Sequence, residues 1–144
     1  MMTVAEQCAR SIVETIQGLG IEGVDADEIA LRDMAEDSYA PRGISVIPMV
    51  ESEGSGTNAK DDYGYRFMVV MSRGSGKAWA EHTTLLQDWR NAVRKAFNNK
   101  RLLDVPQVHI CGVSNGDYLQ PKKWQENRTA SVLVVTCWAR ETRT

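Results

Sequence analysis

The chain has 144 residues, 42% of them hydrophobic and 25% charged, a composition typical of one globular domain over residues 1–144 with a substantial core. No stretch approaches the ~20 consecutive apolar residues of a membrane-spanning helix, and the N-terminus lacks the apolar core of a signal peptide. The three cysteines, Cys8, Cys111 and Cys137, are far apart and form no Cys-x-x-Cys pair. We therefore expect buried thiols in a reducing compartment, and neither a disulfide framework nor a membrane protein.

The net charge of −2 conceals an asymmetry between the two halves of the chain. Residues 1–62 carry 13 acidic and 4 basic side chains, whereas residues 63–144 carry 6 acidic and 13 basic ones. The two halves either neutralise each other within one fold or present opposite charges to neighbouring copies in a head-to-tail ring. A pI near 5.7 argues against a dedicated nucleic-acid site.

The first predicted element is a helix over residues 3–18. Thr3 and Glu6 have the spacing of a capping box, in which each side chain accepts a hydrogen bond from the backbone amide of the other residue. Apolar residues then recur at every fourth position, namely Val4, Cys8, Ile12 and Ile16. This stripe ends at a pair of glycines, so the pattern predicts an amphipathic helix with one buried face.

Three strands are predicted next. Alternation predicts the first around 24–33 and the second over 44–50, where Pro48 favours an edge or a bulge. Residues 51–62 contain no apolar side chain larger than alanine, which predicts a flexible loop. Strict alternation predicts the third strand over 63–72, with one aromatic-rich face.

The rest of the chain predicts a helix and two further strands. An apolar face runs from residue 82 to residue 97. A short strand at 108–113 precedes a strand at 130–141 that is apolar on both faces and is therefore expected at the centre of the sheet, with one side under the helices. The order α-β-β-β-α-β-β predicts an α+β fold, with a mainly antiparallel sheet of four to five strands and two helices packed on one face.

No group of residues has the pattern of a catalytic site. Gly74–Lys77 resembles the end of the P-loop motif Gly-x-x-x-x-Gly-Lys-Ser/Thr. However, Met71 occupies the position of the first glycine and Ala78 that of the Ser/Thr, so we interpret the stretch as a flexible connection. His109 and Cys111 would share one face of a strand, but two ligands do not make a zinc site and nothing indicates an activated thiol. We expect no enzyme, no metal and no cofactor, and a nucleotide-handling enzyme is the third-ranked alternative.

Aromatic and basic residues give candidates for a subunit or partner interface. Arg90, Arg94 and Lys95 form a basic edge on the second predicted helix, and Arg128 extends it. The two tryptophans, Trp79 and Trp124, lie in predicted loops. The six candidates are Trp79, Arg90, Arg94, Lys95, Trp124 and Arg128. Tryptophan together with arginine is typical of interface hot spots. A solvated surface is one alternative, and a single-stranded nucleic-acid site is another, although the aromatics do not repeat along one strand as stacking platforms do.

The order of these motifs resembles the tail-terminator (tail-completion) proteins of tailed bacteriophages and prophages. The similarity spans nearly the whole chain. It rests on the helix "TVAEQCARSIVETIQGL", the strands "GISVIPMVE" and "YGYRFMVVMSRG", the helix "LLQDWRNAVRKAFNNKRL" and the closing strand "ASVLVVTCWARETR". The resemblance implies a structural virion protein of the neck, assembled in the host cytoplasm as a homohexameric ring.

The resemblance also implies the partners of such a ring. It would dock on the last ring of tail-tube protein, end tube polymerisation and present a surface to the head connector, while genomic DNA passes through the lumen without sequence-specific binding. We expect the loop 51–62 to reach the tube or lumen, and Arg90 and Arg94 to contact the acidic half of a neighbouring copy. Another neck component (a head-closure or adaptor protein) and a cytosolic protein-binding module unrelated to virions remain as alternatives.

Overall fold

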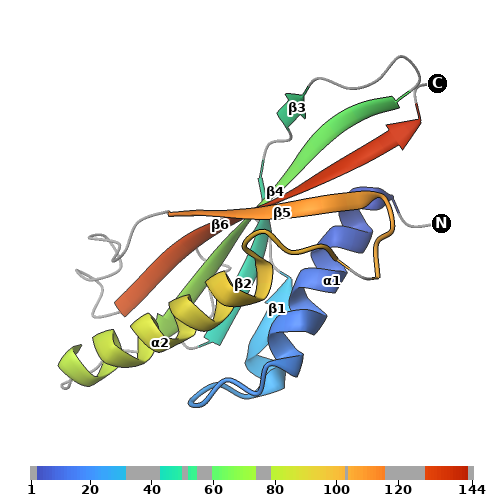
Figure 1. Ribbon diagram of the computed structural model, residues 1–144. Coiled ribbons are helices and arrows are strands. Elements are labelled where there is room, and N and C mark those ends of the chain that lie inside the picture. Colours follow the sequence, from blue (N-terminus) through green and yellow to red (C-terminus); the bar gives the residue numbers. More distant parts are fainter. Residues whose placement is uncertain are drawn as a thin grey trace.

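The computed structural model describes residues 3–31, 43–49, 52–54, 60–73, 79–102, 104–115 and 129–142. The elements in chain order are α1 (Val4–Gly18), the 3₁₀ helix η1 (Ala26–Glu28), β1 (Ile29–Leu31), β2 (Gly43–Pro48), β3 (Ser52–Gly54), β4 (Lys60–Arg73), α2 (Trp79–Phe97), β5 (Val108–Asn115) and β6 (Thr129–Thr142). Both helices lie on one face of a twisted sheet, so the α+β class is confirmed (Figure 1).

Strands β4 and β6 form the centre of the sheet. They pair antiparallel along their whole length, from Lys60 opposite Thr142 to Arg73 opposite Thr129. The order across the sheet is β1-β2-β4-β6-β5, and β3 pairs with β4 beyond the end of β2. Among the described strands, the pairing of β1 with β2 alone is parallel, which confirms a mainly antiparallel sheet.

The alternation in β4 and β6 separates two faces of the sheet. On the inner face, both strands and both helices contribute to one buried cluster. From these four elements the cluster includes Tyr65, Phe67, Val69 and Met71 of β4, Leu133, Val135 and Cys137 of β6, Cys8, Ile12 and Ile16 of α1, and Leu86, Trp89, Val93 and Phe97 of α2. The apolar stripes predicted for the two helices therefore form the core. Removing this surface from water is the main favourable term in folding.

The outer face of the sheet also carries apolar side chains. Ile47, Val70 and Val132 form a second, small buried cluster, with Met68 packed against it. Nearby, Trp138 lies across Gly64: a Cβ at position 64 would come within 3.1 Å of the indole ring. Because β6 has buried apolar residues on both faces and lies between β4 and β5, its predicted central place is confirmed.

The first helix and the strands after it follow the sequence with local differences. Thr3 Oγ1 accepts the Glu6 amide at 3.1 Å, as the capping-box spacing predicts. The strand expected around 24–33 is shorter, because residues 26–28 form η1 and only 29–31 pair with β2. The edge or bulge that Pro48 suggested is not found: β2 lies between β1 and β4, and Pro48, the last residue of β2, pairs with Phe67 two residues beyond the last pairing with β1.

The flexible loop predicted at 51–62 is wrong for six of its residues. Residues 52–54 form β3, and residues 60–62 begin β4, whose Gly64 pairs with Ser52. β3 and this end of β4 extend past both helices (Figure 1). Their residues are polar, so the sequence shows no alternation of apolar side chains from which these strands could be predicted. Residues 51 and 55–59 lie outside the described residues.

The start of the second helix also differs from the prediction. α2 begins at Trp79, three residues before the predicted apolar face, so Trp79 opens a helix and does not lie in a loop. The connection at Gly74–Lys77 is not among the described residues.

We expect Gly43→Ala to lower the free energy of unfolding by about 2–4 kcal/mol. Gly43 has a φ of 126°, and a Cβ there would overlap the carbonyl oxygen of Glu28. The control is Gly18→Ala at the end of α1, where nothing lies within 4 Å of the added carbon, and it should change stability by about 0.5 kcal/mol or less. Urea denaturation measures both, and equal losses would contradict the role of Gly43.

Candidate subunit interface

Arg90 lies inside the protein, which corrects its predicted place on an exposed basic edge. Its side chain is 5% exposed, and Nη1 donates to Ser131 Oγ and to the Val132 carbonyl, both at 2.7 Å. Helical spacing could have revealed this, since position 90 lies four residues after Leu86 and three before Val93, on the buried stripe of α2. Arg90 therefore fastens α2 to β6 and is not positioned to contact another subunit.

The other candidate residues have different places. Lys95 is exposed and Arg94 is partly exposed, so both remain candidates for a surface contact. Trp79 is the first residue of α2, and Trp124 and Arg128 lie outside the described residues. The structure thus brings Arg94 and Lys95 together on one helix end and adds exposed Lys100 and Arg101 just beyond it.

Residues 94–104, the basic segment, run along the outer edge of β5. The Asn99 amide donates to the Cys111 carbonyl at 2.9 Å, and the Cys111 amide donates to the Lys100 carbonyl at 2.7 Å. Asn98 Oδ1 accepts the Val113 amide at 3.3 Å. The segment contains four basic residues and one acidic residue, Asp104. One end of the sheet is therefore bordered by fixed positive charge.

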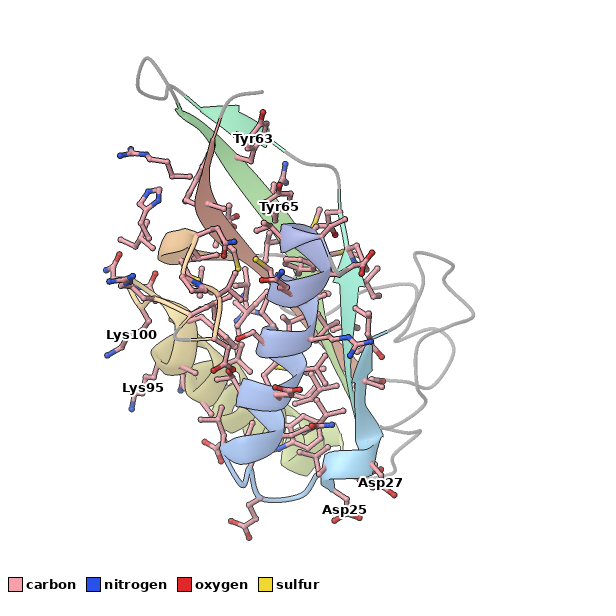
Figure 2. The ribbon with its side chains drawn as sticks, turned by 90° about the vertical axis from the view of Figure 1, so that its right-hand side faces the viewer. Asp25, Asp27, Tyr63, Tyr65, Lys95 and Lys100 are labelled. Atoms are coloured by element: carbon pink, nitrogen blue, oxygen red, sulfur yellow. The ribbon has the colours of Figure 1, made fainter. Side chains whose placement is uncertain are left out.

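Residues 22–28, the acidic segment, precede β1 at the other end of the sheet. Glu22, Asp25 and Asp27 are exposed, and the segment contains no basic residue. Trp89 Nε1 donates to the Glu22 carbonyl at 2.8 Å, and Gln17 Nε2 lies 3.1 Å from the carbonyls of Ala26 and of Ile29. Figure 2 shows Asp25 and Asp27 on the opposite side of the molecule from Lys95 and Lys100.

A mainly apolar groove of about 340 Å³ lies beside β1. Its walls come from the first half of α1 and from β1, β2 and β4. They consist of Ala5, Glu6, Ala9, Arg10, Leu31, Pro48 and Phe67. Leu31 is 48% exposed, the highest value for a large hydrophobic side chain in the part of the chain that the structure describes. At the other end of the sheet, Ile110 of β5 is 37% exposed.

The suggested pairing of His109 with Cys111 is wrong. The register of β5 against β6 shifts between Val108 and Ile110, and this bulge separates the two side chains: His109 is exposed and Cys111 is buried in the core. No cluster of three metal-ligating side chains occurs among the described residues. In the same part of the chain, no helix is long and apolar enough to cross a membrane.

The three cysteines are buried and unbridged, as predicted. Far apart in the sequence, they meet in the core, where the Sγ atoms of Cys111 and Cys137 are 3.7 Å apart. Hydrogen bonding to Cys111, then to Cys8, and burial raise the pKa of the Cys137 thiol, so it stays protonated at neutral pH. The same hydrogen bond lowers the pKa of the Cys111 thiol, but all three cysteines are fully buried and pack as small hydrophobic side chains.

Sequence comparison gives no relatives: no protein-family model matches the chain, and no curated protein matches it. Among solved structures, the chain is similar to the PVC sheath/tube terminator of an extracellular contractile injection system in its extended state. The TM-score is 0.59, the sequence identity is 11%, and the match covers 100% of this chain. The chain has the fold of a tube terminator. It spans 58% of the length of that protein, so the shared terminator fold does not account for the whole of the larger chain.

In this terminator fold, Arg90→Ala is expected to lower the free energy of unfolding by about 2–4 kcal/mol, because the Val132 carbonyl and the Ser131 hydroxyl lose a buried charged donor. Lys95→Ala on the same helix is the control and should lie within about 0.5 kcal/mol of the wild type. Thermal or urea unfolding checks both variants. Similar losses in the two would show that the buried hydrogen bonds of Arg90 contribute little.

We expect none of the three thiols to react with an aromatic disulfide reagent at pH 8 in the native protein, and all three to react once it is unfolded in guanidinium. Their burial blocks the reagent, and the raised pKa of Cys137 removes its thiolate. Rapid labelling of any cysteine in the native state would contradict the buried cluster.

Proposed function

We propose that this chain is a structural protein that ends the tail tube of a phage or phage-like particle. The observation that carries the proposal is the whole-chain fold match to a sheath/tube terminator. The order of sequence motifs independently resembles tail-terminator proteins. Both lead to the same class of protein, although the match has little sequence identity.

The proposed mechanism is steric. Copies of the chain form a ring, with six subunits expected from the resemblance, which binds the last ring of tube protein and blocks the addition of further tube subunits. The opposite side of the ring receives the head connector, and genomic DNA passes through the lumen. The protein then resides in the neck of the virion after assembly in the host cytoplasm, and it performs no catalysis and needs no cofactor.

The tube-facing element in this proposal is the arm formed by β3 and the adjoining ends of β4 and β6. It extends past the helices (Figure 1), where a partner can reach both faces of the sheet. Tyr63 and Tyr65 at its base are stacked, with ring centroids 6.3 Å apart. Tyr65 is buried in the core cluster and Tyr63 packs against that cluster, so the pair anchors the arm to the body of the domain. This arm replaces the loop 51–62 as the docking element.

The test is polymerisation of purified tail-tube protein with and without the chain, followed by electron microscopy. We expect a shorter distribution of tube lengths and added density at one end of each tube. An unrelated acidic protein of similar size is the control. An unchanged length distribution with bare tube ends would contradict tube termination, and binding to purified connectors alone would favour the alternative of another neck component.

A further inference from the structure

We propose that copies of this chain join through the two edges of the sheet. The basic segment beside the edge strand β5 of one subunit contacts the acidic segment before the edge strand β1 of the next. The inference rests on the proposed ring and names the surfaces that close it. The partner at each surface is a second copy of this chain.

The acidic surface is held in place before any partner arrives. Its backbone is fixed by Trp89 at the Glu22 carbonyl and by Gln17 at two further carbonyls. The Asp25 amide donates to Glu28 Oε1 at 2.9 Å, so Glu28 stabilises the turn while Glu22 and Asp27 extend outward. A pre-organised surface loses little conformational entropy on binding.

The basic surface is held in a comparable way. Backbone hydrogen bonds between residues 99–100 and Cys111 attach it to the edge of β5, while Lys95, Lys100 and Arg101 remain exposed. These bonds also occupy backbone groups on the outer edge of β5. A neighbouring subunit therefore meets charged side chains there and not a bare strand edge.

The positions of the two surfaces determine the kind of assembly. β1 and β5 are the first and last strands of the sheet order, roughly 19 Å apart at ordinary strand spacing. Two copies related by a two-fold axis satisfy both surfaces at once only when the two surfaces lie on the same side of the molecule, and Figure 2 shows Asp25 and Asp27 on the opposite side from Lys95 and Lys100. Each copy must therefore use one neighbour for each surface, which gives a head-to-tail contact that closes into a ring or continues as a filament.

Apolar side chains beside the charges supply affinity that exposed ion pairs alone do not. Surface ion pairs contribute little and are screened by salt, although they orient the partners and speed association. Leu31 ends β1, three residues after the acidic segment, and Ile110 lies on the strand bordered by the basic segment. Each charged surface therefore has one exposed apolar side chain close to it that a neighbouring copy can cover.

The test is a charge swap between two variants. The basic-edge variant carries Lys95→Glu and Lys100→Glu; the acidic-edge variant carries Glu22→Lys and Asp27→Lys and leaves Asp25, the N-cap of η1, intact. Like charges then face each other in each pure variant, and self-association should weaken about a hundredfold. Light scattering and negative-stain microscopy are used in solution and, with purified tail tubes present, at tube ends.

An equimolar mixture of the two variants is expected to recover wild-type assembly. In an alternating arrangement every interface pairs opposite charges again, and a single chain with all four substitutions should recover it too. Because recovery requires folded subunits, it also excludes misfolding as the cause of the loss. The control is Glu14→Lys with Asp88→Lys, which changes the charge as much as the acidic-edge variant does at exposed positions of α1 and α2 and should assemble normally.

The outcomes separate this inference from the proposed function. If the single-edge variants assemble normally, or the mixture fails to recover, the interface lies elsewhere while tube capping by the wild type still stands. A wild type that neither self-associates nor caps tubes overturns both. If the basic-edge variant assembles normally but loses binding to random-sequence DNA, the basic segment is a nucleic-acid surface and the inference is wrong.

Discussion

The rest of the structure depends on the pairing of β4 with β6. Each of the outer strands reaches the sheet through one of these two: β2 and β3 pair with β4, β5 pairs with β6, and β1 is attached only through β2. A slip of one residue would turn the inner apolar face of either strand away from the helices. Trp138 packs closely on Gly64, where a Cβ would come within 3.1 Å of the indole ring.

This central pair also holds the elements to which the proposed assembly surfaces belong. The helices cover the inner face. Arg90 links α2 to β6 by two charged hydrogen bonds, which are directional and therefore fix the position of the helix on the strand more closely than a hydrophobic contact does. The far ends of β4 and β6 continue past the helices as an arm with β3 (Figure 1). A tube-capping protein needs a rigid body with extensions that bind different neighbours, and one continuous ladder provides both.

Local patterns in the sequence predicted most helices and strands, but they could not predict features that depend on contacts between distant parts of the chain. The four-residue period of α1 and the alternation of 63–72 each depend on neighbours within one element, so the sequence contains the full signal. The bulge at His109 depends on β6, and the convergence of Cys8, Cys111 and Cys137 depends on the whole topology. The site was less predictable. Arg90 was interpreted as a surface residue from its charge, although its position lies on the apolar stripe of α2. β3 was missed because its residues Ser52–Gly54 have no alternating apolar side chains.

The charge split of the sequence becomes a spatial separation because of the same topology. The first half of the chain forms α1, the acidic segment and β1, and the second half forms α2, the basic segment and β5, so the two halves fill opposite sides of β4 and β6. The strands β1 and β5 are roughly 19 Å apart at ordinary strand spacing. Figure 2 shows Asp25 and Asp27 on the opposite side of the molecule from Lys95 and Lys100. Opposite charge on two sides of the molecule is available to neighbouring copies, and this separation is the physical basis of the proposed head-to-tail contact.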